Sequence, residues 1–144
     1  MTKLENCVTV LVQQHSFIVF GGVLMKWKAD KGRPLCPQIY EQICVRIASG
    51  EYKPNQKLIS VREMAVASGV NPNTVQRSFE MLEQSGIIYS IPASGWYVSE
   101  DTKIAQNTLN ELAMKKMKSF FEEMQSLGLD FASIKKLVEE WENE

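Results

Sequence analysis

The stretch Gly69–Phe79, GVNPNTVQRSF, decides how this chain is organised, because it holds a helix end, a turn and a new helix start. Its glycine supplies the left-handed stop of one helix. Two residues later Asn71 caps the next helix, and Pro72 takes the first helical position, where a missing N–H costs nothing. Val70 faces Val75 as a hydrophobic staple. The stretch predicts a helix-turn-helix.

Two helices are predicted before this turn. The segment Ser60-Val61-Arg62-Glu63 has the form of a capping box, in which serine and glutamate side chains bind each other's backbone amides, so a short helix should cover about 60–68. A first helix is expected from Pro37 to about Ser49, before Gly50. Its apolar stripe recurs every four residues at Ile39, Ile43 and Ile47.

The helix that starts at Pro72 has two different faces. At 100° per residue, Val75, Phe79 and Leu82 fall together and should point inward. The opposite face of its first half presents amides, a hydroxyl and a guanidinium, from Asn73, Thr74, Gln76 and Arg77. Such side chains match the donors and acceptors of base edges in the major groove of B-DNA, so the pattern predicts binding to double-stranded DNA.

A hairpin follows the third helix. Ile87–Ile91 and Gly95–Val98 are rich in β-branched and aromatic residues and are joined by Pro92-Ala93-Ser94. Three helices and a hairpin predict a winged helix-turn-helix domain over 25–99. The fold class is therefore mainly α with a small β-hairpin.

Residues 100–144 form a separate segment with helical periodicity. One long helix is expected from Thr102, Gly128 interrupts it, and Asp130 can cap a second helix. Two helices of this length cannot bury both apolar stripes alone, so the segment predicts an antiparallel pair that joins a second copy in a homodimer. The expected dimerisation residues are Leu109, Leu112, Met117, Phe120, Phe121, Met124, Phe131, Ile134, Val138 and Trp141.

Helix starts add candidate contacts with DNA phosphate. Free amides at Ser60 and Asn71 can face the backbone of DNA, and Arg62 can neutralise a phosphate or reach a base. Simpler interpretations stay open: Ser60 and Asn71 are explained by capping alone. Arg62 could pair with a neighbouring glutamate, and so could Arg77, as ordinary surface charges; the candidates are Glu63, Glu80 and Glu83.

Charge is unevenly distributed along the 144 residues. Residues 25–99 hold nine Lys/Arg against six Asp/Glu, whereas residues 100–144 hold six against ten. This asymmetry favours an anionic partner for the middle segment. Cys7, Cys36 and Cys44 form no CxxC pair, so no disulfide framework and no metal site is predicted, and a reduced cytoplasmic protein is expected.

The first 24 residues are apolar in two pieces that Gln13-Gln14-His15 separates. This break makes a membrane span unfavourable, and no small-residue cleavage site marks a signal peptide. We expect 1–24 to be an unstructured extension upstream of a natural start at Met25. The alternative is an extra strand or helix packed on the domain.

Residues 33–99 resemble the DNA-binding domain of the GntR family of bacterial transcription regulators, through SVREMA and GVNPNTVQRSF above all. The short tail is similar to that of the YtrA-type subfamily. This resemblance implies a dimeric winged-helix repressor that binds an inverted-repeat operator. It also implies DNA contacts at Arg62 and at the polar start of the third helix.

The hairpin departs from the family pattern. Family wings commonly carry basic residues, as in R-x-G-K-G, whereas this one reads Ile91-Pro92-Ala93-Ser94-Gly95. Only Ser94 and the Gly95 amide remain as expected wing contacts. Because each neutralised phosphate adds a slope of about −0.9 to log K against log salt, the salt dependence of DNA binding should be flattened.

Catalysis is not predicted. The chain has one histidine, His15, and neither a glycine-rich phosphate loop nor paired metal ligands, so we expect no enzyme, no catalytic residues and no cofactor. A tail of 45 residues leaves no room for a separate ligand domain, so any small-molecule effector is unknown. The rival to DNA binding is a protein-interaction adaptor that docks through Trp96, Tyr97 and the helical tail.

Overall fold

The computed structural model describes residues 8–12, 15–20, 23–27 and 29–142. The chain divides into two compact units, residues 1–106 and 107–144. The predicted domain boundary at 99/100 stays a prediction, and the division between the two units falls within the long helix. The first turn of the long helix belongs to the first unit, because its Ala105 is buried and Ile104 lies against Gly86.

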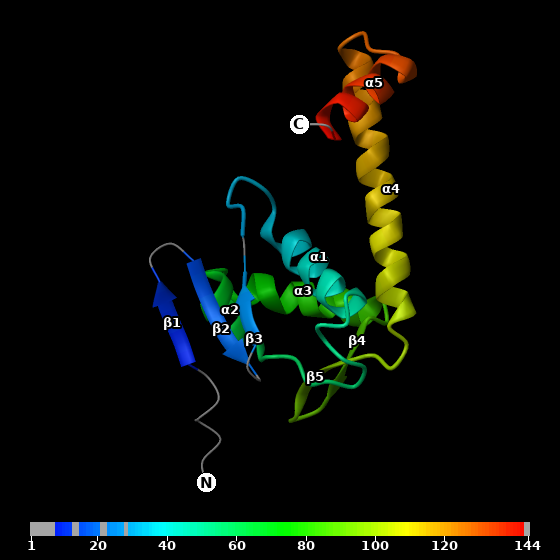
Figure 1. The fold of residues 1–144 in the computed structure, drawn as a ribbon. Helices are drawn as coiled ribbons and strands as arrows, with labels where there is room; N and C mark the ends of the chain where they lie inside the picture. Colours follow the sequence, from blue (N-terminus) through cyan, green and yellow to red (C-terminus); the bar gives the residue numbers. More distant parts are fainter. Residues whose placement is uncertain (1–7, 13–14, 21–22, 28, 143–144) are drawn as a thin grey trace. The chain divides into compact units, whose positions relative to one another are not determined.

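Three helices form the centre of the first unit: α1 (Leu35–Ala48), α2 (Val61–Ser68) and α3 (Pro72–Gln84). Helix α3 packs on both α1 and α2 (Figure 1). Helix α1 begins two residues before the predicted start at Pro37. A proline fits within the first turn, because the amides there have no partner inside the helix.

The turn between α2 and α3 forms as predicted. The backbone N–H of Ser60 donates to Glu63 Oε2 at 2.7 Å, and the N–H of Glu63 donates to Ser60 Oγ at 3.2 Å, which completes the capping box. Gly69 ends α2 with a φ of +65° in the left-handed region that favours glycine. Asn71 then caps α3.

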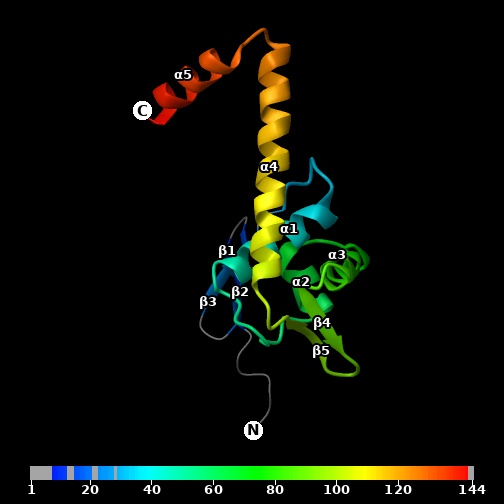
Figure 2. The ribbon, with the colours of Figure 1, turned by 90° about the vertical axis from the view of Figure 1, so that its right-hand side faces the viewer.

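Strands β4 (Ile88–Ile91) and β5 (Gly95–Val98) form the antiparallel hairpin, with Tyr89 opposite Tyr97. Figures 1 and 2 show it extending beyond the three helices. Residues 56–58 of the loop between α1 and α2 pair with β5 through the backbone. Leu58 N donates to Trp96 O at 2.8 Å, and Val98 N donates to Gln56 O at 2.9 Å. This pairing was not predicted from the sequence.

The N-terminal segment differs from the expectation of an unstructured extension. Strands β1 (Val8–Val12), β2 (His15–Phe20) and β3 (Val23–Lys26) pair in that order as an antiparallel sheet, and β2 packs against α2. Segments rich in β-branched residues satisfy their backbone groups by pairing with each other. The alternative of a packed addition therefore fits the described part, while residues 1–7, 13–14 and 21–22 lie outside it.

Trp27 follows β3 and connects this segment to α1. Its ring is buried, and the guanidinium carbon of Arg46 lies 4.6 Å from the ring centroid. This cation–π contact sits over a desolvated ring, where such contacts are stronger than at exposed sites. The residue after the sheet is thus part of the packed first unit.

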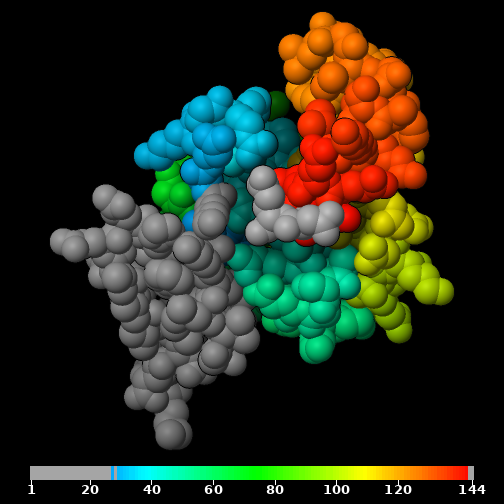
Figure 3. All heavy atoms as spheres, turned by 45° about the horizontal axis from the view of Figure 1, so that its top comes forward, coloured from blue at the N-terminus to red at the C-terminus, as the bar shows by residue number. Residues whose placement is uncertain are grey.

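The second unit consists of the greater part of α4 (Lys103–Ser126) together with α5 (Phe131–Glu142). Gly128 turns the chain with a φ of +84°, and Asp130 Oδ1 accepts a hydrogen bond from Ser133 N at 2.9 Å, as predicted for a cap. Phe121 stacks on Phe131 with ring centroids 5.6 Å apart. In the space-filling view the orange and red atoms of the end of α4 and of α5 lie together (Figure 3).

Candidate nucleic-acid interface

The two faces of α3 are arranged as its periodicity predicts. Val75, Phe79 and Leu82 are fully buried, and the Phe79 ring meets Trp96 edge-on with centroids 5.7 Å apart. Asn73 and Arg77 are exposed on the other side. The inward stripe thus fixes the rotation of α3, and the hairpin packs on the same stripe.

The two capping residues satisfy the amides of their own helices. Asn71 Oδ1 accepts from Asn73 N at 2.8 Å, and Ser60 Oγ accepts from the amide of Glu63. Their roles as caps are confirmed. Contact of Ser60 and Asn71 with DNA stays a prediction, because each side-chain oxygen already has a partner within the protein.

The two arginines of the predicted interface are exposed and keep their charge available. Neither Arg62 nor Arg77 forms an ion pair within the described part of the chain. The carboxylates that could have neutralised them bind elsewhere: Glu63 holds the capping box, Glu80 accepts from Gln76, and Glu83 accepts from Ser90. The interpretation of both arginines as paired surface charges is therefore wrong.

The side chains of Gln76 and Thr74 are less available for DNA contact than the sequence suggests. Gln76 Nε2 donates to Glu80 Oε1 at 2.9 Å, one turn along the same face. Thr74 is half-buried, and its carbonyl accepts from Ser78 Oγ at 2.9 Å. The bond to Glu80 uses one of the two amide N–H groups of Gln76 and leaves the other N–H and the amide oxygen available to a base. Among the described residues, by contrast, no side-chain hydrogen bond restricts the side chains of Asn73 or Arg77.

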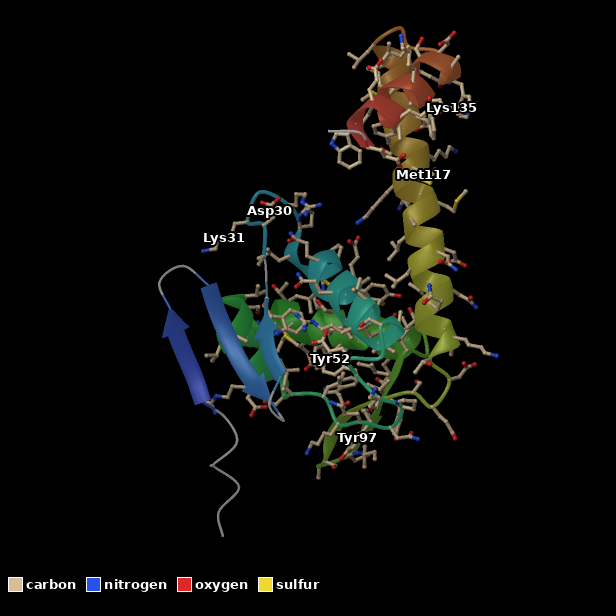
Figure 4. All side chains as sticks on the ribbon, viewed as in Figure 1. Asp30, Lys31, Tyr52, Tyr97, Met117 and Lys135 are labelled. Atoms are coloured by element: carbon tan, nitrogen blue, oxygen red, sulfur yellow. The ribbon has the colours of Figure 1, made fainter. Side chains whose placement is uncertain are left out.

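The tip of the hairpin is built from Ser94 and Gly95. Ser94 Oγ shares a hydrogen bond with the hydroxyl of Tyr97, and Gly95 has a φ of +128°, a conformation that side chains disfavour. Figure 4 shows Tyr97 on the hairpin, on the segment that leads away from this tip. Lys57, which the sequence did not mark as a site residue, runs beside Gly95.

The second unit leaves much apolar surface uncovered. Of the predicted dimerisation residues, Ile134 is buried, while Leu109, Leu112, Phe121 and Met124 are half-buried. The others are exposed: Met117, Phe120, Phe131, Val138 and Trp141. Leu137, which the sequence did not single out, is 49% exposed and lines a groove of about 380 Å³ with Phe120 and Trp141.

The buried cysteine outside this interface has a structural role. Burial raises the pKa of the Cys44 thiol to about 12, so this cysteine stays protonated at neutral pH and is not a reactive thiolate. Among the described residues, no group of histidine, cysteine, aspartate and glutamate has an arrangement that could hold a metal. No helix in this part of the chain is both long and apolar enough to cross a membrane.

A helix-turn-helix whose second helix exposes amides and an unpaired arginine, followed by a packed hairpin, defines a winged-helix DNA-binding protein. The family model "Bacterial regulatory proteins, gntR family" matches residues 35–98. The chain belongs to the GntR family. It is a transcription regulator and not an enzyme.

Relatives and solved structures agree with this assignment. The uncharacterized HTH-type transcriptional regulator YhcF of Bacillus subtilis (strain 168) is 36% identical over 100 residues, which are 69% of this chain and 83% of YhcF. The HTH-type transcriptional repressor YtrA of the same organism is 38% identical over 97 residues, covering 67% of this chain and 70% of YtrA. A GntR family transcriptional regulator from Listeria monocytogenes superposes with a TM-score of 0.68, at 35% identity, over 77% of this chain and 97% of its own. The similarity to a YtrA-type regulator is thereby confirmed.

Proposed function

We propose that this chain is a homodimeric transcriptional repressor that binds an inverted-repeat operator, with the start of α3 in the major groove. The observation that carries this proposal is the pair of exposed arginines, Arg62 and Arg77, whose neighbouring glutamates are all engaged with other groups. Two uncompensated guanidiniums beside an exposed amide form a surface suited to phosphate and base edges.

The roles within this interface follow from the side-chain chemistry. Arg77 and Asn73 would read bases, since arginine pairs with guanine and asparagine with adenine through two hydrogen bonds each. Arg62, one turn into α2, would neutralise phosphate. Thr74, Gln76 and the capped helix starts at Ser60 and Asn71 would complete the contacts, with Ser94 and Gly95 at the wing.

The homodimer is proposed from the surface of the second unit. Trp141 is 76% exposed and Phe131 is 66% exposed, so two of the largest apolar side chains in α5 face solvent in a single chain. Exposed apolar patches of this kind mark interaction sites. A second copy supplies an identical apolar stripe, and two copies with a twofold axis match an inverted repeat.

Repression is proposed by analogy with relatives. YtrA is named a transcriptional repressor, and so are the relatives NagR of Bacillus subtilis and MngR of Escherichia coli. A bound dimer would exclude RNA polymerase from an overlapping promoter. Cytoplasmic localisation accords with this role, and an effector remains unassigned.

The test is a titration of the full chain against labelled DNA from immediately upstream of its gene, followed by fluorescence anisotropy. Scrambled DNA of the same composition measures unspecific binding. Arg77→Ala should lower the affinity for the specific fragment by about 1–3 kcal/mol, while Gln84→Ala at the far end of α3 should leave it unchanged.

Each outcome separates the proposal from its rival. Tight binding that needs both the native sequence and Arg77 supports a specific DNA-binding regulator. Equal, weak binding to both DNAs that Arg77→Ala does not change would overturn specific binding to this fragment and favour the adaptor. Light scattering at micromolar concentration tests the dimer, and a monomeric mass would contradict it.

A further inference from the structure

The hairpin has no cation of its own at the tip. Its turn, Ile91 to Gly95, consists of apolar and small polar residues, so the sequence alone predicts weak wing contacts with phosphate. The loop between α1 and α2 changes this expectation, because it pairs with β5 and brings a lysine to the same sheet.

Lys57 lies directly beside the wing. Its backbone forms a bridge opposite Tyr97, with antiparallel direction. A methyl group built on Gly95 would stand 3.2 Å from Lys57 Cε and 3.9 Å from Lys57 Nζ. Because Gly95 precedes Tyr97 by two residues on the same strand face, the lysine side chain runs diagonally from its bridge partner toward the turn.

The surroundings hold this segment against β5. Tyr89 stacks on Tyr97 with ring centroids 5.6 Å apart, and the Tyr89 hydroxyl donates to Asn55 Oδ1 at 3.1 Å. The backbone N–H of Asn55 donates to Val98 O at 2.9 Å. The loop is therefore fastened on both sides of Lys57, so the start of its side chain has a defined position on the wing.

The charge of Lys57 is not neutralised locally. The residue is exposed, and within the part of the chain that the structure describes it forms no ion pair. An ammonium group on a four-carbon stem suits a phosphate oxygen as a point charge, without the fixed geometry of arginine. Gly95 lets the stem lie close to the backbone of the tip.

We propose that Lys57 is the wing's phosphate-binding residue: it reaches across Gly95 and neutralises a DNA backbone phosphate, in place of the basic residues that the hairpin lacks. This inference rests on the proposed DNA binding and adds a contact from a segment outside both the helix-turn-helix and the hairpin. It replaces the expectation of a flattened salt dependence, because the cation is supplied by the neighbouring loop.

The experiment measures the slope of log K against log salt for the full chain on its upstream DNA, using wild type, Lys57→Gln and Lys57→Arg. Lys53→Gln is the matched control, because it removes the same charge from the same loop, and its ammonium lies toward Gly50 instead of Gly95. Lys57→Gln should reduce the magnitude of the slope by about 0.9 for each bound protomer. Lys57→Arg should restore it, and Lys53→Gln should match wild type.

The failure of this inference can be told apart from the failure of DNA binding. If wild type binds specifically and Arg77→Ala weakens it, but Lys57→Gln has the same slope as Lys53→Gln, the lysine contact is wrong and the proposed function stands. If wild type does not distinguish the upstream DNA from scrambled DNA, both proposals fall. Circular dichroism of Lys57→Gln checks that the fold is unchanged, as expected for an exposed side chain.

Discussion

The two units of this chain use apolar residues in opposite ways. In the first unit the stripes of α1 and α3 meet each other, and Ile43, Val75 and Phe79 have no exposed surface. In the second unit only Ile134 is buried among the α5 residues, while Trp141 and Phe131 face solvent. The stripes of the first unit are covered within the chain, whereas those of the second unit stay largely exposed.

This contrast shows that helical periodicity predicts an apolar face without predicting what covers it. Three short helices and a hairpin can enclose a core, because their stripes converge from several directions. Two helices joined by one turn offer a single contact line, so part of each stripe remains exposed. Association with a second copy would give the second unit the core that the first already has.

The largest effect is expected for a substitution in the buried core of the first unit. Phe79→Ala should lower the free energy of unfolding by about 3–5 kcal/mol, because it removes a buried ring that packs against Trp96. Urea denaturation measures the change. Val66→Ala, at a side chain that is 64% exposed in α2, should change stability by about 0.5 kcal/mol or less, and equal losses for both variants would contradict the assigned core.

The next largest effect is expected for an exposed aromatic residue of the second unit. Trp141→Ala should weaken dimerisation by about 2 kcal/mol, close to thirtyfold in Kd, because large aromatic side chains dominate interfaces. Sedimentation equilibrium measures the dissociation constant, with Lys115→Ala as an exposed control on α4. An unchanged dimer in Trp141→Ala would show that a different surface joins the copies.

A smaller effect is expected at the start of α2. Ser60→Ala should lower the free energy of unfolding by about 1 kcal/mol, because it leaves the amide of Glu63 without its 3.2 Å partner. Ser60→Asp, which can still cap, should retain most of the stability in urea denaturation. If Ser60→Asp and Ser60→Ala lose equal stability, the serine matters for a reason other than capping.

The smallest effect concerns the start of α5. Hydrogen bonds from the Ser133 side chain, and then from its backbone amide, lower the pKa of Asp130 below its ordinary value of 3.8. The folded-state pKa is therefore the lower one. Stabilisation by this carboxylate is complete above the unfolded-state value and is lost as the pH falls through the folded-state value.

Far-UV circular dichroism between neutral and acidic pH measures this loss as a decrease in helicity. Asp130→Asn should remove the dependence that comes from this position, because asparagine caps helices without titrating. A wild-type acid transition that Asp130→Asn reproduces without change would mean that other carboxylates control it.

Much of the fold was predictable because its signals are local. The Ser60–Glu63 capping box, the glycine stop at Gly69 and the cap at Asn71 each depend on a few adjacent residues, and the structure confirms all three. The inward face of α3 follows from the regular rotation of a helix. Likewise, Arg77 could be selected as a candidate site residue from its position on the opposite face.

Other features were missed because they depend on partners far along the chain. The N-terminal strands find their pairs and their place against α2 only in the folded unit. Residues 56–58 pair with β5 only in the folded structure, so the sequence did not mark Lys57 as a site residue. Likewise, Arg62 and Arg77 lack an ion-pair partner within the residues that the structure describes, because the neighbouring glutamates accept hydrogen bonds from other groups.

The sequence by itself determined the helix-turn-helix, the hairpin, the exposed polar face of α3 and the apolar stripes of α4 and α5, because caps, turns and periodicity are properties of short segments. Only the tertiary structure decided which charges remain unpaired and which loop joins the wing. Those outcomes depend on distances between residues such as Lys57 and Gly95, 38 positions apart, which no local pattern encodes.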